Sequence, residues 1–313
     1  MKTRRSGLTV IEILVVVGII ALLVGLLMPA VHTVQKMAKE TKQKAQFTAI
    51  ELGLAAFKSD YGDYPPSDWF DPLISGTTPG PYCGAQKLAE AMLGWDLLGF
   101  HPDSEWTATG LEKAGTANTI YHAPNNLQKR KSRYVELETA NPFLLGSLDG
   151  SGMDALFSGT VSPLVPRTYV LCDVFTRSER KVRLSDGTMV AAGTPILYYK
   201  ANPASLLHDP PTLQATSACI YNARDNAAIV SLGWLGDADK APNLRRQHPL
   251  AADVVRPGFD YFYDYILDKK IAVVRDPQIP VRRWPVRPDS YLLISAGMDG
   301  LYGTEDDICN FGR

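Results

Sequence analysis

The longest apolar run of the sequence lies near its N-terminal end. Every residue from Ile13 to Met28 is apolar or glycine. Counted from Leu8, the run reaches the roughly 20 residues that a helix needs to cross a bilayer. The residues before it include three basic ones, Lys2, Arg4 and Arg5. Basic residues before a span favour the cytoplasmic side for that end. The pattern predicts one membrane-spanning helix over residues 8–30.

A helical pattern with polar and apolar faces continues to about residue 59. A narrow apolar stripe recurs from Val31 to Ala55 at alternating steps of three and four residues. A bulkier stripe beside it consists of Phe47, Ile50, Leu54 and Phe57. Lysine and glutamate fill the other positions, so this half faces water and should pack its bulky stripe on a globular head. The helix over residues 8–59 would be about 75 Å long, and it can bend at Pro29.

The rest of the chain predicts a head of short strands and turns. The Gly-Asp-Tyr-Pro-Pro sequence of residues 62–66 ends the helix, and residues 86–99 predict a second, shorter one. Strands are expected over residues 169–175, 181–184, 189–192, 195–200 and 290–296, and the second and third form a hairpin around an Asp-Gly turn. Residues 209–253 read as mostly irregular, and residues 259–268 are either helical or extended. The expected fold class is α+β, with the long N-terminal helix packed on an antiparallel-sheet head.

One carboxylate, Glu12, interrupts the N-terminal apolar segment. Placing an ionised acid near the edge of the hydrocarbon costs on the order of a few kcal/mol unless the acid has a partner. We therefore expect Glu12 to have a function. If the chain is cut after Gly7, Leu8 gains a free amine. That amine would lie one helical turn from Glu12, or beside the Glu12 of a neighbouring copy.

The segment Gly7-Leu8-Thr9-Val10-Ile11-Glu12 resembles the G-F-T-L-I-E signature of type IV pilins and of type II secretion pseudopilins. The resemblance implies that a prepilin peptidase cuts between Gly7 and Leu8 and methylates the amine of Leu8. It implies that Glu12 sets the register of each subunit against its neighbour in a helical filament. Leu8 and Val10 depart from the signature only by apolar replacement, which the family tolerates. Many family members also carry a proline at the place of Pro29.

The resemblance also implies an organisation and a location. Residues 1–7 would be a leader peptide, 8–30 a transmembrane and filament-core helix, 31–60 its amphipathic half, and 61–313 a periplasmic pilin-like head with insertions. The protein would be a single-pass protein of a bacterial inner membrane with a cytoplasmic N-terminus. Its partners would be the prepilin peptidase, other pseudopilin subunits, the inner-membrane assembly platform and the lipid bilayer. The resemblance covers residues 1 to about 66 and about 289 to 311.

A second motif, at residues 295–308, is an acidic, glycine-rich loop that follows the last predicted strand. Its glycines permit the positive φ angles of a closed loop, and its carboxylates and carbonyls are the oxygen ligands that calcium prefers. The loop resembles the C-terminal calcium loop of the major type II pseudopilin, with its S-x-G-x-D-G start and D-D-I end. The ligands that this resemblance implies are Asp299 and Asp307, then Asp306, with carbonyl oxygens from Leu301 and Thr304. The alternative is an acidic surface turn that binds no ion.

The composition argues against several functional classes of protein. A hydrophobic content of 45% and a formal net charge of −1 indicate a folded protein without the basic excess of a nucleic-acid binder. The four cysteines, Cys83, Cys172, Cys219 and Cys309, include no C-x-x-C pair, which argues against a zinc ribbon or thioredoxin-like site. Three disulfide connectivities and four free thiols all remain open.

No catalytic motif is present, so we assign no catalytic residue and expect no enzyme. The five histidines are scattered. Of two further acidic segments, residues 149–154 resemble a calcium site loosely, with an incomplete ligand set, and residues 237–240 are expected to be a solvated turn. The basic residues 129–133 are expected in a solvated loop. A cleaved signal peptide and a plain anchor are weaker explanations of the apolar run, because it is long and contains Glu12. A minor pilin with a binding head and a tethered periplasmic enzyme remain as alternative functions.

Overall fold

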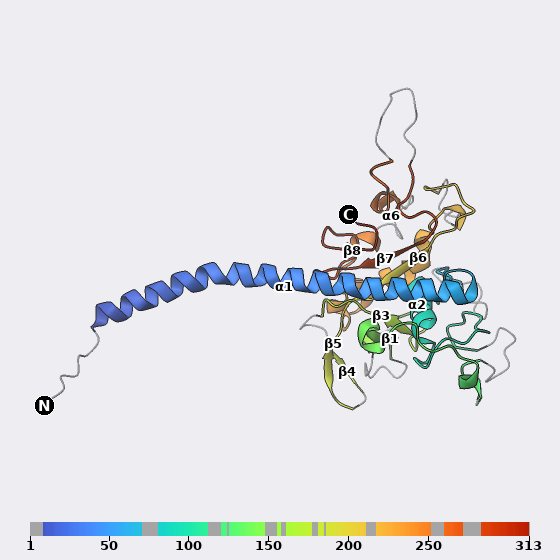
Figure 1. Ribbon diagram of the computed structural model, residues 1–313, viewed down its shortest axis with the longest axis horizontal. Coiled ribbons are helices and arrows are strands. Elements are labelled where there is room, and N and C mark those ends of the chain that lie inside the picture. Colours follow the sequence, from blue (N-terminus) through green and yellow to red (C-terminus); the bar gives the residue numbers. More distant parts are fainter. Residues whose placement is uncertain are drawn as a thin grey trace, which may run out of the picture. The chain divides into compact units, whose positions relative to one another are not determined.

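The computed structural model describes residues 9–70, 81–111, 120–123, 125–147, 155–157, 161–176, 181–184, 186–210, 217–251, 260–271 and 283–312. The chain divides into two compact units, Met1–Lys42 and Gln43–Arg313. The described helices are α1 (Val10–Tyr61), α2 (Gly84–Leu93), α3 (Leu137–Ala140), α4 (Ala227–Val230) and α6 (Asp260–Tyr265). The described strands are β1 (Pro142–Gly146), β2 (Ala155–Phe157), β3 (Tyr169–Leu171), β4 (Lys181–Arg183), β5 (Met189–Ala191), β6 (Leu197–Lys200), β7 (Tyr291–Ser295) and β8 (Ile308–Cys309) (Figure 1).

The first unit consists of the N-terminal part of α1. Its large apolar side chains from Val10 to Met37 are all exposed where the structure describes them. Pro29 lies inside the helix without ending it. By length and composition this part of α1 could cross a membrane, a test that a signal sequence near the N-terminus also passes.

In the second unit, the rest of α1 buries the predicted bulky stripe. Its four residues, Phe47, Ile50, Leu54 and Phe57, are at most 3% exposed. Leu52, which belongs to the narrow stripe, is 73% exposed. The buried face also carries Gln46, whose Nε2 donates to the carbonyls of Thr139 at 2.8 Å and Cys172 at 2.9 Å. The periodicity of the sequence therefore identified the face of α1 that packs on the head.

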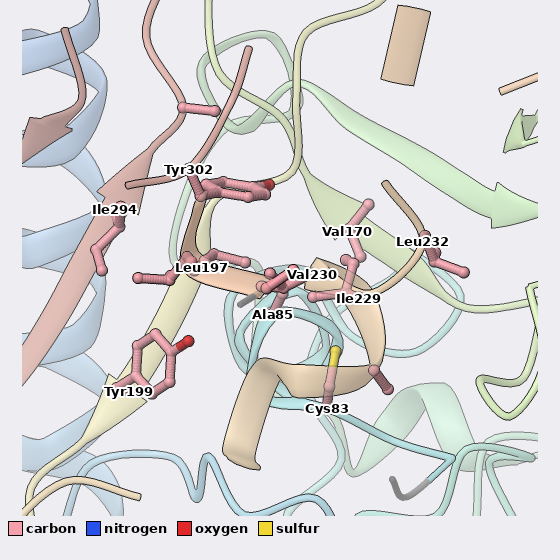
Figure 2. Packing of buried hydrophobic residues seen from close by; sticks show 14 of the residues in the cluster. Cys83, Ala85, Val170, Leu197, Tyr199, Ile229, Val230, Leu232, Ile294 and Tyr302 are labelled. Atoms are coloured by element: carbon pink, nitrogen blue, oxygen red, sulfur yellow. The ribbon is translucent and has the colours of Figure 1, made fainter. Parts of the chain in front are cut away.

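An antiparallel sheet, β6-β7-β8, forms the centre of the second unit. Successive strand residues point to opposite faces, and here both faces are covered. On one face, Tyr198 and Leu293 share a hydrophobic cluster with the bulky stripe of α1. On the other, Leu197 and Ile294 pack with Ile229, Val230 and Tyr302, as Figure 2 shows. Burial on both faces explains why β7 reads as a continuous apolar run rather than an alternating one.

Two smaller sheets complete the described strands. In the sheet β2-β1-β3, β3 pairs with β1 in antiparallel orientation, whereas β2 pairs with it in parallel. Strands β4 and β5 form the predicted hairpin. The α+β class predicted from the sequence is confirmed. The two strands of the parallel pair were not predicted from the sequence, because each is short and shows no alternation of apolar and polar residues.

Three details differ from the sequence-based expectations or decide between them. The second helix ends at Leu93, because Gly94 adopts a positive φ of 87° and donates its N–H to the carbonyl of Glu90. The basic segment at residues 129–133 is not simply a solvated loop. The Arg130 side chain is 2% exposed and pairs with Asp96. The four cysteines are all free thiols, and only Cys309 is not fully buried.

Candidate functional site

The N-terminal candidate residues fall partly outside the described part of the chain. Gly7 and Leu8 lie outside the described residues, whereas Glu12 occupies the first turn of α1 and is exposed. Its Oε2 accepts two hydrogen bonds from Thr9, one from the backbone N–H and one from the hydroxyl, both at 2.8 Å. In return, the backbone N–H of Glu12 donates to Thr9 Oγ1 at 3.4 Å.

This reciprocal pair is a capping box, which satisfies donors that the first turn of a helix leaves without partners. Glu12 thus stabilises the start of α1 within its own chain. The T-x-x-E spacing of Thr9 and Glu12 is the sequence signal that predicts this role, beside the role in register expected of Glu12 above. The charge of the carboxylate is not required for the box, since glutamine serves at the same position.

The C-terminal candidate residues form a closed loop between β7 and β8. Gly297 has a φ of 59°, and a Cβ there would approach the carbonyl oxygen of Asp306 to 2.1 Å. Asp306 Oδ2 accepts from the backbone N–H of Asp299 at 2.8 Å, and Asp299 Oδ1 accepts from that of Leu301 at 2.7 Å. The glycine and the bond between Asp299 and Asp306 hold the two ends of the loop together, and the bond between Asp299 and Leu301 tightens its first turn.

Several predicted ligand oxygens gather around one hydroxyl. Thr304 Oγ1 lies 3.1 Å from the carbonyl oxygen of Leu301, 2.6 Å from Asp306 Oδ1 and 3.5 Å from Asp307 Oδ1. The other oxygen of Asp307 accepts from Tyr265 at 2.5 Å and from the backbone N–H of Gly303 at 2.7 Å. The structure therefore brings Leu301, Thr304, Asp306 and Asp307 together, with one Asp307 oxygen already engaged.

The carboxylates of the loop influence one another. Partial burial and the adjacent charge of Asp306 raise the pKa of Asp299, against the opposing hydrogen bond from Leu301. Burial would also raise the pKa of Asp306, but hydrogen bonds from the Thr304 hydroxyl and the Asp299 N–H outweigh it and lower that pKa. Such a pair favours a bound cation or a retained proton.

No group of three or more His, Cys, Asp or Glu side chains within the described residues is arranged to hold a metal ion. A calcium ion at the loop would therefore depend on carbonyl and hydroxyl oxygens beside the carboxylates, which is a donor set that calcium accepts. Of the weaker acidic candidates, residues 149–154 lie outside the described part of the chain. Asp237 is buried and bonds Lys240 at 2.7 Å and the backbone N–H of Arg246 at 3.0 Å, so it has a structural role.

Comparison with known proteins gives one partial match. No protein-family model matches the sequence, and no solved structure matches it. The chain is 31% identical over 81 residues to the "Type II secretion system core protein G" of Aeromonas hydrophila. The match covers 26% of this chain and 57% of the relative, so the chain spans little more than half the length of that protein. The protein thus has a distant, partial similarity to a type II secretion component, whose name states no enzymatic activity.

Proposed function

We propose that this protein is a pseudopilin-like structural subunit of a type II secretion system. The similarity to core protein G carries the proposal, because that relative is a secretion component and this chain also has an exposed apolar helix near its N-terminus. The order of residues is the one that the pilin signature requires. The basic residues and Gly7 precede the helix, and Glu12 lies within it. The subunit would support secretion as part of a filament and would catalyse no reaction.

The N-terminal part of α1 would act in two environments. Its apolar side chains are exposed all around the helix, an arrangement typical of a segment covered by lipid or by other helices. Before assembly the bilayer of the bacterial inner membrane would cover them, with the head in the periplasm. After the prepilin peptidase cuts between Gly7 and Leu8, the helices of neighbouring subunits would replace the lipid. Each subunit would join the filament at the assembly platform. Its Glu12 would then pair with the methylated amine of Leu8 in a neighbouring subunit.

The C-terminal loop is proposed to bind Ca²⁺. The support is the chemistry of its donors, which are all oxygen atoms and include the carboxylates of Asp299, Asp306 and Asp307. A bound ion would offset the repulsion between these carboxylates. It would hold the segment before β8 against the end of β7, and so keep the central sheet complete.

One observation favours a second candidate, a minor type IV pilin whose head binds a surface or partner. The similarity to core protein G covers only 26% of the chain, which leaves most of the head without a counterpart. Filaments visible outside the cell that contain this protein would favour that candidate. Filaments confined to the periplasm would favour the pseudopilin.

The first test is intact-mass measurement and N-terminal sequencing of the protein purified from its native membrane. Processing predicts a chain that starts at Leu8 with one added methyl group. A chain that starts at Met1, or a cut beyond Met28, would remove the filament function. The substitution Gly7→Leu, which destroys the cleavage position, should leave the leader attached, whereas Gly18→Ala should leave processing unchanged.

A further inference from the structure

A cavity of about 380 Å³ lies in the second unit and shares no lining residue with either candidate site above. Its walls come from the segment that follows α1, which contributes Asp63 and Ser67, and from the end of β6 at Lys200. The 3₁₀ helix η3 (Ala223–Asn226) contributes Asp225 and is preceded by Asn222. Neither the N-terminal signature nor the calcium loop explains this arrangement.

Asp225 is the unusual residue of the cavity. It is 4% exposed, and its Oδ2 accepts a hydrogen bond from the Ser67 hydroxyl at 2.5 Å. Its Oδ1 is buried and has no hydrogen-bond partner among the described residues. A buried carboxylate oxygen without a donor is costly, and proteins rarely keep such a group without a use.

The cations around the cavity are engaged by other carboxylates. Lys200 Nζ lies 2.5 Å from Asp63 Oδ2, and Lys87 Nζ lies 3.0 Å from Asp68 Oδ1. Each lysine is thus paired with another carboxylate, and no cation of the described residues lies within ion-pair distance of Asp225. The lining as a whole therefore carries an excess of negative charge.

We propose that this cavity binds an organic ammonium group, with the Asp225 carboxylate as its counter-ion. An ammonium group carries three N–H donors, so it can supply the donor that Oδ1 lacks. A calcium ion fits less well, because it takes 6–8 oxygen ligands, whereas Asp63 and Asp68 are already paired with lysines and Asp225 offers only Oδ1. The volume admits a small amine or a lysine side chain from a peptide. This inference does not depend on the proposed role in secretion.

Protonation of Asp225 should compete with the ammonium group. Burial raises the pKa of Asp225 to about 7, with the charge of Asp68 adding to the rise and Ser67 and Lys87 opposing it. The titratable and charged groups that face Asp225 or its cavity are Asp63, Asp68, Lys87, Lys200, Cys219 and Tyr263. Since only the ionised carboxylate attracts a cation, amine binding should strengthen as the pH rises from 6 to 8.

The test uses the full-length protein in detergent and calorimetric titration with two probes. Methylammonium represents a free amine, and the peptide acetyl-Ala-Lys-Ala-amide represents a lysine side chain. Tetramethylammonium, which has no N–H donor, and acetyl-Ala-Ala-Ala-amide are the matched negative probes, all at constant ionic strength. We expect one or both ammonium probes to bind and to release protons near pH 7. The tighter of the two identifies the source of the ammonium group.

Two variants separate the site from general charge effects. Asp225→Asn keeps the shape of the side chain and removes its charge, and should weaken binding by about tenfold or more, because a hydrogen bond between two charged groups is lost. Asp186→Asn makes the same chemical change at an exposed turn and should bind as the wild type does. If Asp225→Asn fails to fold, proton release by the wild-type protein still reports on the carboxylate. Equal binding by Asp225→Asn, or no binding of either ammonium probe to the wild type, would overturn the proposal and leave a cavity that holds water only.

Discussion

Glu51 of α1 accepts a hydrogen bond from Arg287 Nη1 at 2.8 Å, which joins the long helix to the turn before β7. The same Arg287 nitrogen donates to the carbonyl of Asn310 at 2.8 Å, and the Asn310 amide donates to Glu51 at 3.1 Å. The Arg287 guanidinium also lies 5.1 Å from the ring centre of Tyr291. Three segments distant in sequence therefore meet at one partly exposed ion pair.

Glu51→Gln should lower the free energy of unfolding by about 0.5–1 kcal/mol, because solvent screens a pair whose side chains are about one third exposed. Urea unfolding followed by tryptophan fluorescence measures this change. Glu40→Gln, at an exposed pair with Lys36 on the same helix, is the control and should change nothing measurable. Equal effects of the two variants would contradict the role given to Arg287.

Leu54→Ala should destabilise the second unit by about 2–5 kcal/mol, because it opens a cavity between α1 and the central sheet. Leu52→Ala deletes the same atoms from the exposed face of the same helix and should change stability by less than about 0.5 kcal/mol. The two unfolding curves, measured side by side, test whether the bulky stripe is the face that anchors α1. A large loss from Leu52→Ala would show that the narrow stripe is covered as well.

The capping box and the proposed register role of Glu12 can be separated by three variants. Glu12→Gln keeps a side chain that serves in a capping box but removes the charge, whereas Thr9→Ala weakens the box and keeps the charge. If the charge sets register, Glu12→Gln and Glu12→Val should enter the membrane and assemble poorly, and Thr9→Ala should assemble well. Cross-linking between neighbouring subunits measures assembly. Normal assembly of Glu12→Gln would leave capping as the only function of the residue.

Calcium should stabilise the full-length protein against heat. A free Ca²⁺ concentration 100-fold above the dissociation constant would add about 2.7 kcal/mol, and a chelator should remove the gain. Asp299→Asn and Asp307→Asn should abolish the gain, whereas Asp186→Asn should retain it. Mg²⁺ is the control ion. It should stabilise the protein much less than Ca²⁺ does, because it requires a stricter octahedral arrangement of ligands. A calcium-induced rise in Tm that persists in both loop variants would place the ion elsewhere.

Asp225 should make stability fall as the pH rises from about 4 to 7. Its folded-state pKa of about 7 lies above the ordinary aspartate pKa of 3.8, so the folded protein binds more protons than the unfolded chain in this window. The contribution is fully present below about pH 4 and lost above pH 7, and it amounts to on the order of 1–4 kcal/mol. Asp225→Asn should remove this slope, so the difference between variant and wild type in urea unfolding at several pH values isolates it. Parallel pH profiles would show that Asp225 does not retain its proton.

The sequence predicts the local features of the fold well and the long-range ones poorly. The spacing of Phe47, Ile50, Leu54 and Phe57 identifies the buried face of α1, because helix geometry alone decides which residues share a face. The burial of Arg130 was missed, because its partner Asp96 comes from another segment and no local pattern joins them.

The candidate sites show the same difference between local features, which the sequence predicts, and long-range contacts, which it does not. The closed C-terminal loop follows from its glycines and aspartates, whereas the bond from Tyr265 to Asp307 depends on how α6 packs. Likewise, nothing near Asp225 in the sequence indicates a buried carboxylate. Only the packing of η3 against the segment after α1 places it beside Ser67.

The position of β7 has a consequence for how the chain folds. This strand lies between β6 and β8 and contributes to both hydrophobic clusters, yet it comes from residues 291–295 of a chain of 313. The central sheet therefore cannot form before β7 and β8 have been synthesised, and until then the apolar residues that they cover lack their partners. Deletion of residues 291–309 should leave a head that cannot fold.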